Sequence, residues 1–461
     1  MPPRFGTSGL RGLVTELTDD LVAAHVTAFV RSCPVGKGLF VARDLRASSP
    51  GLAACVARAA RDAGLAVTDC GAVPTPALAL AAMTAGAAAV MVTGSHIPDD
   101  RNGLKFYTPD GEITKAQEAA ILAALATPTP AGSASGPEPV RNTGTGAAYL
   151  ARYVTAYGPA ALSGLRIGIY SHSAVGRDLM VQVFAALGAE TIELGRAERF
   201  VPVDTEAVDA GTRARLQDWA ATGRLDAIVS SDGDGDRPLM TDAAGQVIAG
   251  DLLGQITAAA LGADAVVTPV SSNTGLEASG RFARTLRTRI GSPFVIAGME
   301  AAGGRVVGYE ANGGFLLGFA ARGPAGPLPA LMTRDALLPL IAPLARARAA
   351  GLGLGALVAA EPPRFTAADR LQDVPTDLGQ ALVARLEADA VARAAFLAPF
   401  GTETAMDLTD GVRITLEGGR IVHLRPSGNA PELRFYTEAE SRSAADDLLT
   451  RGLAALAKAL H

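Results

Sequence analysis

The sequence predicts a multidomain α/β protein, and three observations support that prediction. The chain has 461 residues, about three times the length of a usual single domain and enough for three or four domains. Short apolar runs alternate with helical patterns from residue 39 onward, which is typical of βαβ units in parallel or mixed sheets. A segment rich in Pro, Gly and Ser at residues 127–140 separates the first such region from the second.

The expected strands lie in four successive regions of the chain. The first three regions are α/β, with strands expected at residues 39–43, 66–69, 88–92, 166–170, 226–229 and 265–268, and a helix from Asp251. After residue 351 the pattern becomes α+β, with a helix at residues 378–386, strands at 412–416, 421–425 and 433–437, and a closing helix. We therefore expect three similar α/β domains with mixed sheets and a C-terminal α+β domain, at residues 1–140, 141–250, 251–355 and 356–461.

The composition argues against nucleic-acid and membrane partners. A net charge of -5 provides no attraction to polyanions or to anionic lipid. No secretory signal is apparent at the start, and the longest apolar stretch, residues 77–92, is interrupted and short for a membrane span. The three cysteines, an odd number without metal-ligand spacing, favour a reducing compartment. We expect a cytoplasmic protein.

A loop with a candidate nucleophile follows the expected strand at residues 88–92. The loop reads TGSHIP, and it places Ser95 at the carboxyl end of a strand, where open α/β sheets bind ligands. The alternative is a turn serine that bonds its own backbone. Lys105, one of four lysines in an arginine-rich chain, follows in the same segment. A lysine provides a titratable ammonium that arginine cannot supply, which favours a chemical role.

A candidate metal loop, DGDGDR, follows the expected strand at residues 226–229. Asp232, Asp234 and Asp236 alternate with glycines, so their oxygens can converge on a hard divalent cation. An EF-hand is excluded because its sixth and twelfth positions, Gly and Glu, are here Arg237 and Ala243. A solvated acidic turn is the remaining alternative, disfavoured because three close carboxylates repel one another without a cation.

Two later loops and the N-terminus offer further ligand contacts. Glu310 and Asn312 lie beside glycines in GYEANGG and suit sugar hydroxyls. The loop RPSGNAP combines a guanidinium, a hydroxyl, an amide and exposed backbone N–H groups, which suits a phosphate. Arg11 lies in the N-terminal FGTSGLRG. Each segment alone also fits an ordinary turn or a glycine-rich arm.

Together these segments resemble the α-D-phosphohexomutase family, which includes phosphomannomutases, phosphoglucomutases and phosphoglucosamine mutases. The resemblance covers nearly the whole chain and rests on FGTSGLRG, ARDLRASS, TGSHIPDDRNGLK, DGDGDR, YEANGG and RPSGNAP, in that order. It implies four domains around a central cleft and a magnesium-dependent enzyme, a monomer or a homodimer. Such an enzyme interconverts hexose 6-phosphate and hexose 1-phosphate through a phosphoserine and a hexose 1,6-bisphosphate intermediate.

The resemblance also implies roles for individual residues. Ser95 would carry the phosphoryl group and join Asp232, Asp234 and Asp236 as a metal ligand. Lys105 would shuttle a proton, with Arg11 and His96 beside the phosphoserine. The implied substrate-binding residues are Arg237, Glu310, Asn312, Arg425, Ser427, Gly428 and Asn429.

The sugar loop departs from the family pattern. It commonly reads Glu-x-Ser-Gly-His, whereas here Asn312 replaces the serine and Gly314 occupies the histidine position. The stretches PVDTEAV, TPVSSN and GYEANGG are similar to sequences of bacterial members that act on mannose phosphate. Mannose phosphate is therefore the first expectation, followed by glucose phosphate and glucosamine phosphate.

Two other function classes are disfavoured. A serine hydrolase would pair Ser95 with His96 or another histidine, but adjacent residues rarely form such a pair and the G-x-S-x-G elbow is absent. A non-catalytic sugar-phosphate binding protein would need the phosphate loop, but neither a nucleophile nor the triple-aspartate loop.

Overall fold

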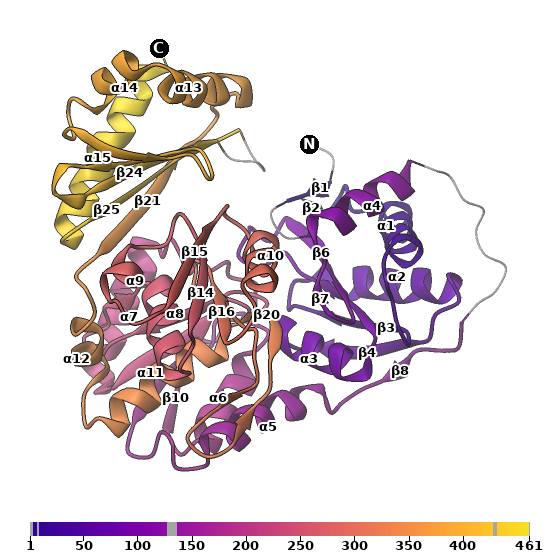
Figure 1. The fold of residues 1–461 in the computed structure, drawn as a ribbon. Helices are drawn as coiled ribbons and strands as arrows, with labels where there is room; N and C mark the ends of the chain where they lie inside the picture. The colour runs from indigo at the N-terminus through magenta and orange to yellow at the C-terminus, as the bar shows by residue number, and fades with distance from the viewer. Residues whose placement is uncertain (1–2, 7–8, 127–135, 427–430, 461) are drawn as a thin grey trace.

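The chain folds around four large sheets, and Figure 1 shows the N-terminal and C-terminal units on opposite sides of the middle of the molecule. The computed structural model describes residues 3–6, 9–126, 136–426 and 431–460. Three of the sheets mix parallel and antiparallel pairs, and the fourth is antiparallel. The predicted fold class, mixed α/β sheets followed by an α+β unit, is confirmed.

The first sheet has eight strands with helices on both faces. Alternate residues of its central strand face opposite layers: Val90 packs with α1 and α2, whereas Met91 packs with α3. All five residues of that strand are therefore buried, as expected for a strand covered on both sides. The elements of this unit are β1 (Arg4–Phe5), β2 (Leu10–Leu13), α1 (Asp19–Ser32), β3 (Leu39–Arg43), α2 (Ser49–Asp62), β4 (Val67–Ala72), α3 (Thr75–Ala85), β5 (Ala88–Val92), β6 (Arg101–Thr108), β7 (Gly111–Glu112), α4 (Lys115–Leu125) and β8 (Val140–Arg141).

The second sheet has the strand order β10-β9-β11-β12-β13. Its central strand continues two residues beyond the expected end, through Ser230 and Ser231, which are polar but buried. Their hydroxyls donate to the carbonyls of Tyr170 and Asp232, so the strand tolerates them. The elements are α5 (Thr145–Tyr157), β9 (Arg166–Tyr170), α6 (Arg177–Ala186), β10 (Glu190–Leu194), α7 (Ala210–Gly223), β11 (Ala227–Ser231), β12 (Pro238–Thr241) and β13 (Val247–Ile248).

The third sheet repeats this arrangement in the order β15-β14-β16-β17-β20. Its helix α8 begins at Gly250, one residue before the expected start. The elements are α8 (Gly250–Ala260), β14 (Ala265–Pro269), α9 (Gly275–Ala278), β15 (Arg284–Thr288), α10 (Ser292–Ala302), β16 (Val306–Tyr309), β17 (Phe315–Leu317), β18 (Ala321–Arg322), β19 (Pro327–Leu328), β20 (Leu331–Asp335), α11 (Leu337–Ala349) and α12 (Leu354–Ala359).

The fourth sheet is antiparallel, in the order β21-β25-β24-β23-β22, and the helix that closes the chain packs against β21 and β25. Its core is separate from the others and centres on Phe435, Leu424 and Leu448. The elements are β21 (Phe365–Leu371), α13 (Thr376–Ala388), α14 (Ala390–Leu397), β22 (Glu403–Asp407), β23 (Val412–Leu416), β24 (Ile421–Pro426), β25 (Leu433–Ala439) and α15 (Arg442–Ala459). Among the described residues, no helix has the length and apolar character needed to cross a membrane.

Three sheets share one arrangement of strands, and this arrangement positions the candidate site. In each, a strand that pairs in parallel with one neighbour is followed by a strand that pairs with it antiparallel: β5 and β6, β11 and β12, β16 and β17. The loops that join these pairs carry the TGSHIP, DGDGDR and EANGG motifs. The three motifs thus occupy equivalent places, at the carboxyl end of a buried strand.

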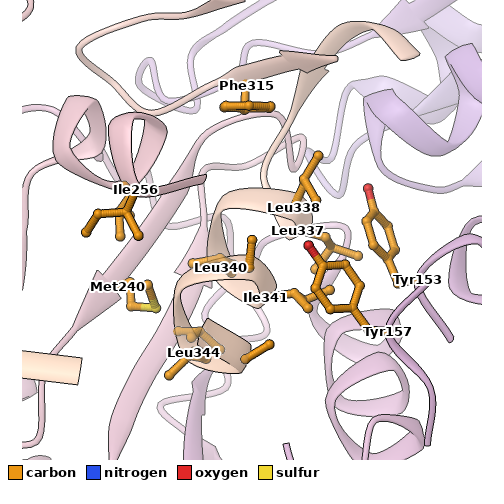
Figure 2. Close-up of a cluster of buried hydrophobic side chains, with 14 of the residues drawn as sticks. Tyr153, Tyr157, Met240, Ile256, Phe315, Leu337, Leu338, Leu340, Ile341 and Leu344 are labelled. Carbon is orange, nitrogen blue, oxygen red and sulfur yellow. The ribbon is translucent and has the colours of Figure 1, made fainter. Parts of the chain in front are cut away.

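The second and third sheets share one hydrophobic core. Figure 2 shows the apolar side chains of α11 between Met240 of β12, Ile256 of α8 and the tyrosines of α5. A polar contact joins the same elements, since the buried Asp335 carboxylate accepts hydrogen bonds from Tyr149 and Tyr153. The helix that leads into the second sheet is thereby bound to the end of the third.

We expect Tyr149→Phe to destabilise the protein by about 1.5–3 kcal/mol, because a buried carboxylate loses a hydrogen-bond donor. Thermal and denaturant unfolding would measure the loss. Tyr157→Phe is the matched control: it lies on the same helix, and no described hydrogen bond involves its hydroxyl. Equal unfolding midpoints for the two variants would show that the contact with Asp335 does not stabilise the fold.

Candidate active site

The serine loop and the aspartate loop are in direct contact, although 137 residues separate them in the sequence. Ser95 Oγ donates a hydrogen bond of 2.5 Å to Asp232 Oδ2. A second contact joins the start of α3 to the same loop, because the Thr75 hydroxyl donates to Asp234 Oδ2 at 2.5 Å and the Thr75 N–H donates to the Asp234 carbonyl. The carboxyl ends of β5 and β11 therefore meet at one place.

Ser95 itself has an unusual backbone conformation. Its φ is 54°, in the left-handed region that residues other than glycine rarely adopt. Its N–H donates to the Thr93 hydroxyl at 2.7 Å, and that hydroxyl donates to Asp44 Oδ2 at 2.8 Å. Such a conformation costs free energy and persists where surrounding contacts fix it, which is common at functional sites.

Arg46 binds the backbone of the serine loop. Its guanidinium is fully buried and pairs with Asp44 at 3.1 Å. It donates to four backbone carbonyls of the segment, those of Ser95, Ile97, Pro98 and Arg101. Gly94 lies against it, because an added Cβ there would approach the Arg46 Cζ to 2.5 Å. Arg46 lies in the ARDLRASS motif, but its role is not visible in the sequence because the loop carbonyls that it binds lie 49–55 residues away.

The three aspartates form a compact buried cluster. Each side chain is fully buried, and one oxygen from each lies within 4.8 Å of the others. The Asp232 Oδ1 atom accepts from the backbone N–H groups of the loop itself, at 3.1–3.2 Å. Lys105 Nζ pairs with Asp234 Oδ2 at 2.6 Å and also with Asp236 Oδ2. Arg334 Nη2 lies 2.8 Å from the same Asp236 oxygen.

Among the described residues, these contacts leave one oxygen of Asp234 and one of Asp236 without a hydrogen-bond donor. Asp234 Oδ1 and Asp236 Oδ1 are buried and accept no hydrogen bond; the nearest cation to Asp236 Oδ1 is Arg237 Nε at 3.9 Å. Asp232 Oδ2 is bound by Ser95 alone. Buried carboxylate oxygens normally have a partner, so this arrangement fits a hard divalent cation with oxygen ligands.

The electrostatics of the cluster follow from burial and repulsion. Burial raises the pKa of Asp232 well above its ordinary value, and repulsion by Asp234 and Asp236 adds to the shift. Burial opposes ionisation of Asp234 too, but the adjacent Lys105 ammonium outweighs it and lowers that pKa. Burial lowers the pKa of Arg11 to about 10, and the charges of Asp234 and Asp236 oppose this shift. The charges of Lys105 and Arg11, which lie in the first sheet, therefore interact with the charges of the aspartate loop.

His96 is a neutral acceptor in this arrangement. Burial and the charge of Arg237 lower its pKa to about 3. Arg237 Nη1 lies 2.9 Å from His96 Nδ1, and a guanidinium can only donate, so the ring nitrogen accepts. Ser95 Oγ lies farther from the same nitrogen, at 3.3 Å. The lone pair that a base needs is occupied, which argues against a Ser95–His96 hydrolase pair.

The sugar loop adjoins this cluster. Glu310 is buried and accepts from Arg334 Nη1 at 3.2 Å. Asn312 folds the loop itself, because its Oδ1 accepts the Gly314 N–H at 3.0 Å and its backbone carbonyl accepts from Thr205. Glu310 is thus brought to the metal cluster, whereas the amide oxygen of Asn312 is used within the loop.

Among the described residues, Arg425 is the candidate from the fourth loop, and its ion pair is with a residue outside the other three loops. Arg425 Nε lies 2.8 Å from Asp410 Oδ2, in the same unit. That carboxylate oxygen also accepts the Ile290 N–H at 2.9 Å, which links the fourth unit to the third. Ser427, Gly428 and Asn429 lie outside the described residues.

Comparison with known proteins identifies the fold and the chemistry together. Three domain models of the phosphoglucomutase/phosphomannomutase family match this chain. The model of α/β/α domain I matches residues 2–131, that of α/β/α domain III matches residues 241–365, and that of the C-terminal domain matches residues 373–452. A phosphomannomutase of Sinorhizobium fredii is 46% identical and covers 99% of both chains. The chain belongs to the phosphoglucomutase/phosphomannomutase family. It is accordingly an isomerase, as the motifs indicated.

Other members of the same family are also similar to this chain. A phosphomannomutase of Salmonella muenchen is 41% identical over 96% of this chain and 94% of its own. A phosphoglucosamine mutase of Symbiobacterium thermophilum is 33% identical over 66% of this chain and 72% of its own. Among solved structures, a phosphoglucomutase/phosphomannomutase family protein of Burkholderia thailandensis superposes with a TM-score of 0.76 at 23% identity, covering 98% of this chain and 96% of that one. The last comparison supports the fold of the family.

We expect Gly94→Ala to destabilise this phosphohexomutase by about 1–3 kcal/mol and to lower its turnover, because the new methyl group would displace Arg46 from the serine loop. Unfolding and a coupled mutase assay would measure both effects. Gly51→Ala is the control, since a Cβ there meets no atom within 4 Å. If Gly94→Ala has the same unfolding midpoint and the same turnover number as Gly51→Ala, the contact with Arg46 does not position the loop.

Proposed function

We propose that this enzyme interconverts mannose 6-phosphate and mannose 1-phosphate through a phosphoserine at Ser95 and a hexose 1,6-bisphosphate intermediate. The observation that carries the proposal is the contact of the Ser95 hydroxyl with Asp232, inside a buried cluster of three carboxylates. The choice of mannose is supported by the names of the relatives, since those at 46% and 41% identity are phosphomannomutases. A phosphoglucosamine mutase matches at 33%.

Magnesium is the proposed cofactor. Asp232, Asp234, Asp236 and Ser95 would hold it, since they present oxygen atoms only and two of those atoms accept no hydrogen bond. When bound, the ion neutralises negative charge on the oxygens of the transferring phosphoryl group.

The side chains of the serine loop would perform the transfer. Phosphoryl transfer depends on in-line alignment and charge neutralisation, so the rigid loop held by Arg46 sets the position of the donor. The bond between Ser95 Oγ and phosphorus breaks as the free sugar hydroxyl forms its own bond to phosphorus. The Lys105 ammonium would give one proton to the departing Ser95 oxygen, and the neutral amine that results would take the proton of the sugar hydroxyl, so that the proton count is unchanged. Asp232 Oδ2 then accepts the restored hydroxyl, as it does here.

The rest of the site would hold the sugar and its other phosphate. Glu310 binds sugar hydroxyls, with Asn312 shaping its loop, and Arg11 and the Arg237–His96 pair lie beside the transferring group. Arg425, with Ser427, Gly428 and Asn429, binds the phosphate that does not react. Whichever hydroxyl faces Ser95, that phosphate lies at the opposite end of the hexose, so one phosphate loop serves both isomers.

The cellular setting follows from the thiols. All three cysteines are buried and form no disulfide. Free buried thiols fit a reducing compartment, and we place the enzyme in the cytoplasm as a monomer or a homodimer.

Replacing Ser95 is the central test. We expect Ser95→Ala to lose at least about 10³-fold of its turnover, because the nucleophile is removed. A coupled assay with the phosphates of mannose, glucose and glucosamine, with 1,6-bisphosphate added, would measure this and rank the sugars. Intact-mass analysis should find a phosphoryl group on the wild type and on Ser32→Ala, a remote control, but not on Ser95→Ala. Near-normal turnover by Ser95→Ala would contradict the phosphoserine mechanism.

The metal site has its own test. We expect Asp234→Asn to weaken magnesium binding about ten-fold or more, because a charged ligand becomes neutral. Calorimetric titration would measure the affinity, and excess chelator should abolish wild-type activity until magnesium is restored. Asp218→Asn, an exposed change on α7, is the control. Activity that persists in excess chelator would exclude a magnesium-dependent reaction.

A further inference from the structure

One buried arginine outside the sequence motifs joins the metal loop to the sugar loop. Arg334, in β20, is 2% exposed. Its Nη2 lies 2.8 Å from Asp236 Oδ2 and its Nη1 lies 3.2 Å from Glu310 Oε2. Asp236 follows β11 of the second sheet, whereas Glu310 follows β16 of the third. A single planar group therefore bridges the carboxylates of two loops.

The first sheet holds the same arginine from a third side. Glu112, in β7, lies 3.6 Å from Arg334 Nε through its Oε1. The same carboxylate accepts from the hydroxyls of Ser292, at 2.7 Å, and Thr333, at 3.3 Å. Because a guanidinium is planar and rigid, three partners around it leave it one orientation.

The space for the Arg334 stem exists because residue 314 has no side chain. A Cβ added at Gly314 would lie 2.9 Å from Arg334 Cδ, 3.0 Å from Arg334 Cγ and 3.1 Å from the carbonyl oxygen of Asp236. The first distance is shorter than a Cβ contact in a folded protein and the other two are tighter than ordinary contacts, so the arginine stem would have to shift. Gly314 is not among the residues with positive φ, so its backbone does not require glycine. Space is the reason for glycine at this position.

We propose that Arg334 is a positioning residue that sets the sugar loop against the metal loop, and that Gly314 is glycine to admit it. The proposal rests on the proposed roles of Asp236 and Glu310. Arg334 binds one oxygen of each carboxylate, so it directs the other oxygen of Asp236 toward the metal cluster and orients Glu310 for a hydroxyl. It also accounts for the departure of the loop from the family pattern, because a larger residue at 314 would occupy the place of the arginine stem.

Crowding the arginine without removing any charge tests the proposal directly. We expect Gly314→Ala to weaken magnesium binding about three- to ten-fold and to raise KM and lower kcat together. Gly353→Ala, where a Cβ meets no atom within 4 Å, should leave magnesium affinity, KM and kcat unchanged. Magnesium affinity is measured by calorimetry, which needs no turnover, so the test survives even if the preferred sugar is not mannose or if Ser95 is not the nucleophile.

A double-mutant cycle separates positioning from simple packing damage. With Arg334→Ala there is no stem to displace, so adding Gly314→Ala should then cost less than about two-fold in magnesium affinity. Equal costs of Gly314→Ala in both backgrounds would overturn the pairing of the two residues.

Arg334→Lys provides an independent test if Arg334→Ala does not fold. It keeps the buried charge, but it lacks the planar fork that places Nη2 on Asp236 and Nη1 on Glu310 at the same time. We expect it to retain the thermal midpoint within a few degrees and yet lose magnesium affinity and raise KM by about ten-fold. Unchanged affinity and KM in Arg334→Lys would overturn the positioning role.

Discussion

The burial of three carboxylates on one short loop is the constraint on which the rest of the structure depends. Asp232, Asp234 and Asp236 are all fully buried, and unpaired buried charges are strongly unfavourable. The protein offsets that cost with cations from other units: Lys105 from the first sheet and Arg334 from the third. The arrangement of the first three units is therefore coupled to the charge of a single loop.

The repeated arrangement of strands explains how one fold brings different chemistry to one place. In each of the three mixed sheets, the functional loop joins a strand with a parallel neighbour to the antiparallel strand that follows it. These loops emerge at the carboxyl ends of strands, so three sheets facing a common region present a hydroxyl, a carboxylate cluster and a buried glutamate to each other. The chemistry differs because the loop residues differ, while the backbone frame is reused.

Sequence reasoning found the parts of the site that are local in the chain. Ser95 and the three aspartates follow apolar strands in short motifs, so both their type and their place at a sheet edge could be predicted. Thr75 and Arg334 could not be found in this way, because their partners lie far away in the sequence and the residues around them form no chemical pattern. Arg46 lies in the ARDLRASS motif, but the loop carbonyls that it binds are 49–55 residues away.

The structural roles of several polar residues could not be predicted from the sequence. Ser230 and Ser231 end a buried strand, and their polar character concealed its true length. Asn312 is expected to contact substrate, and the structure adds that its amide oxygen accepts the Gly314 N–H within the same loop. Arg425 was expected to bind phosphate, and in the structure a carboxylate from a neighbouring turn of the same sheet is its partner.

In Asp234 and in Asp236 the two carboxylate oxygens have different surroundings. The outer oxygens of Asp234 and Asp236 bind Lys105, Thr75 and Arg334, and the inner ones are the atoms without a hydrogen-bond donor. Protein cations and a metal ion therefore need not compete for the same atom. Each guanidinium or ammonium restrains the rotation of a carboxylate about its bond to Cβ, so the oxygens that would bind a cation are oriented by the protein itself. A site preorganised in this way spends less binding free energy on ordering its ligands, and two of the residues that bring this about, Thr75 and Arg334, lie outside every motif that identifies the chemistry.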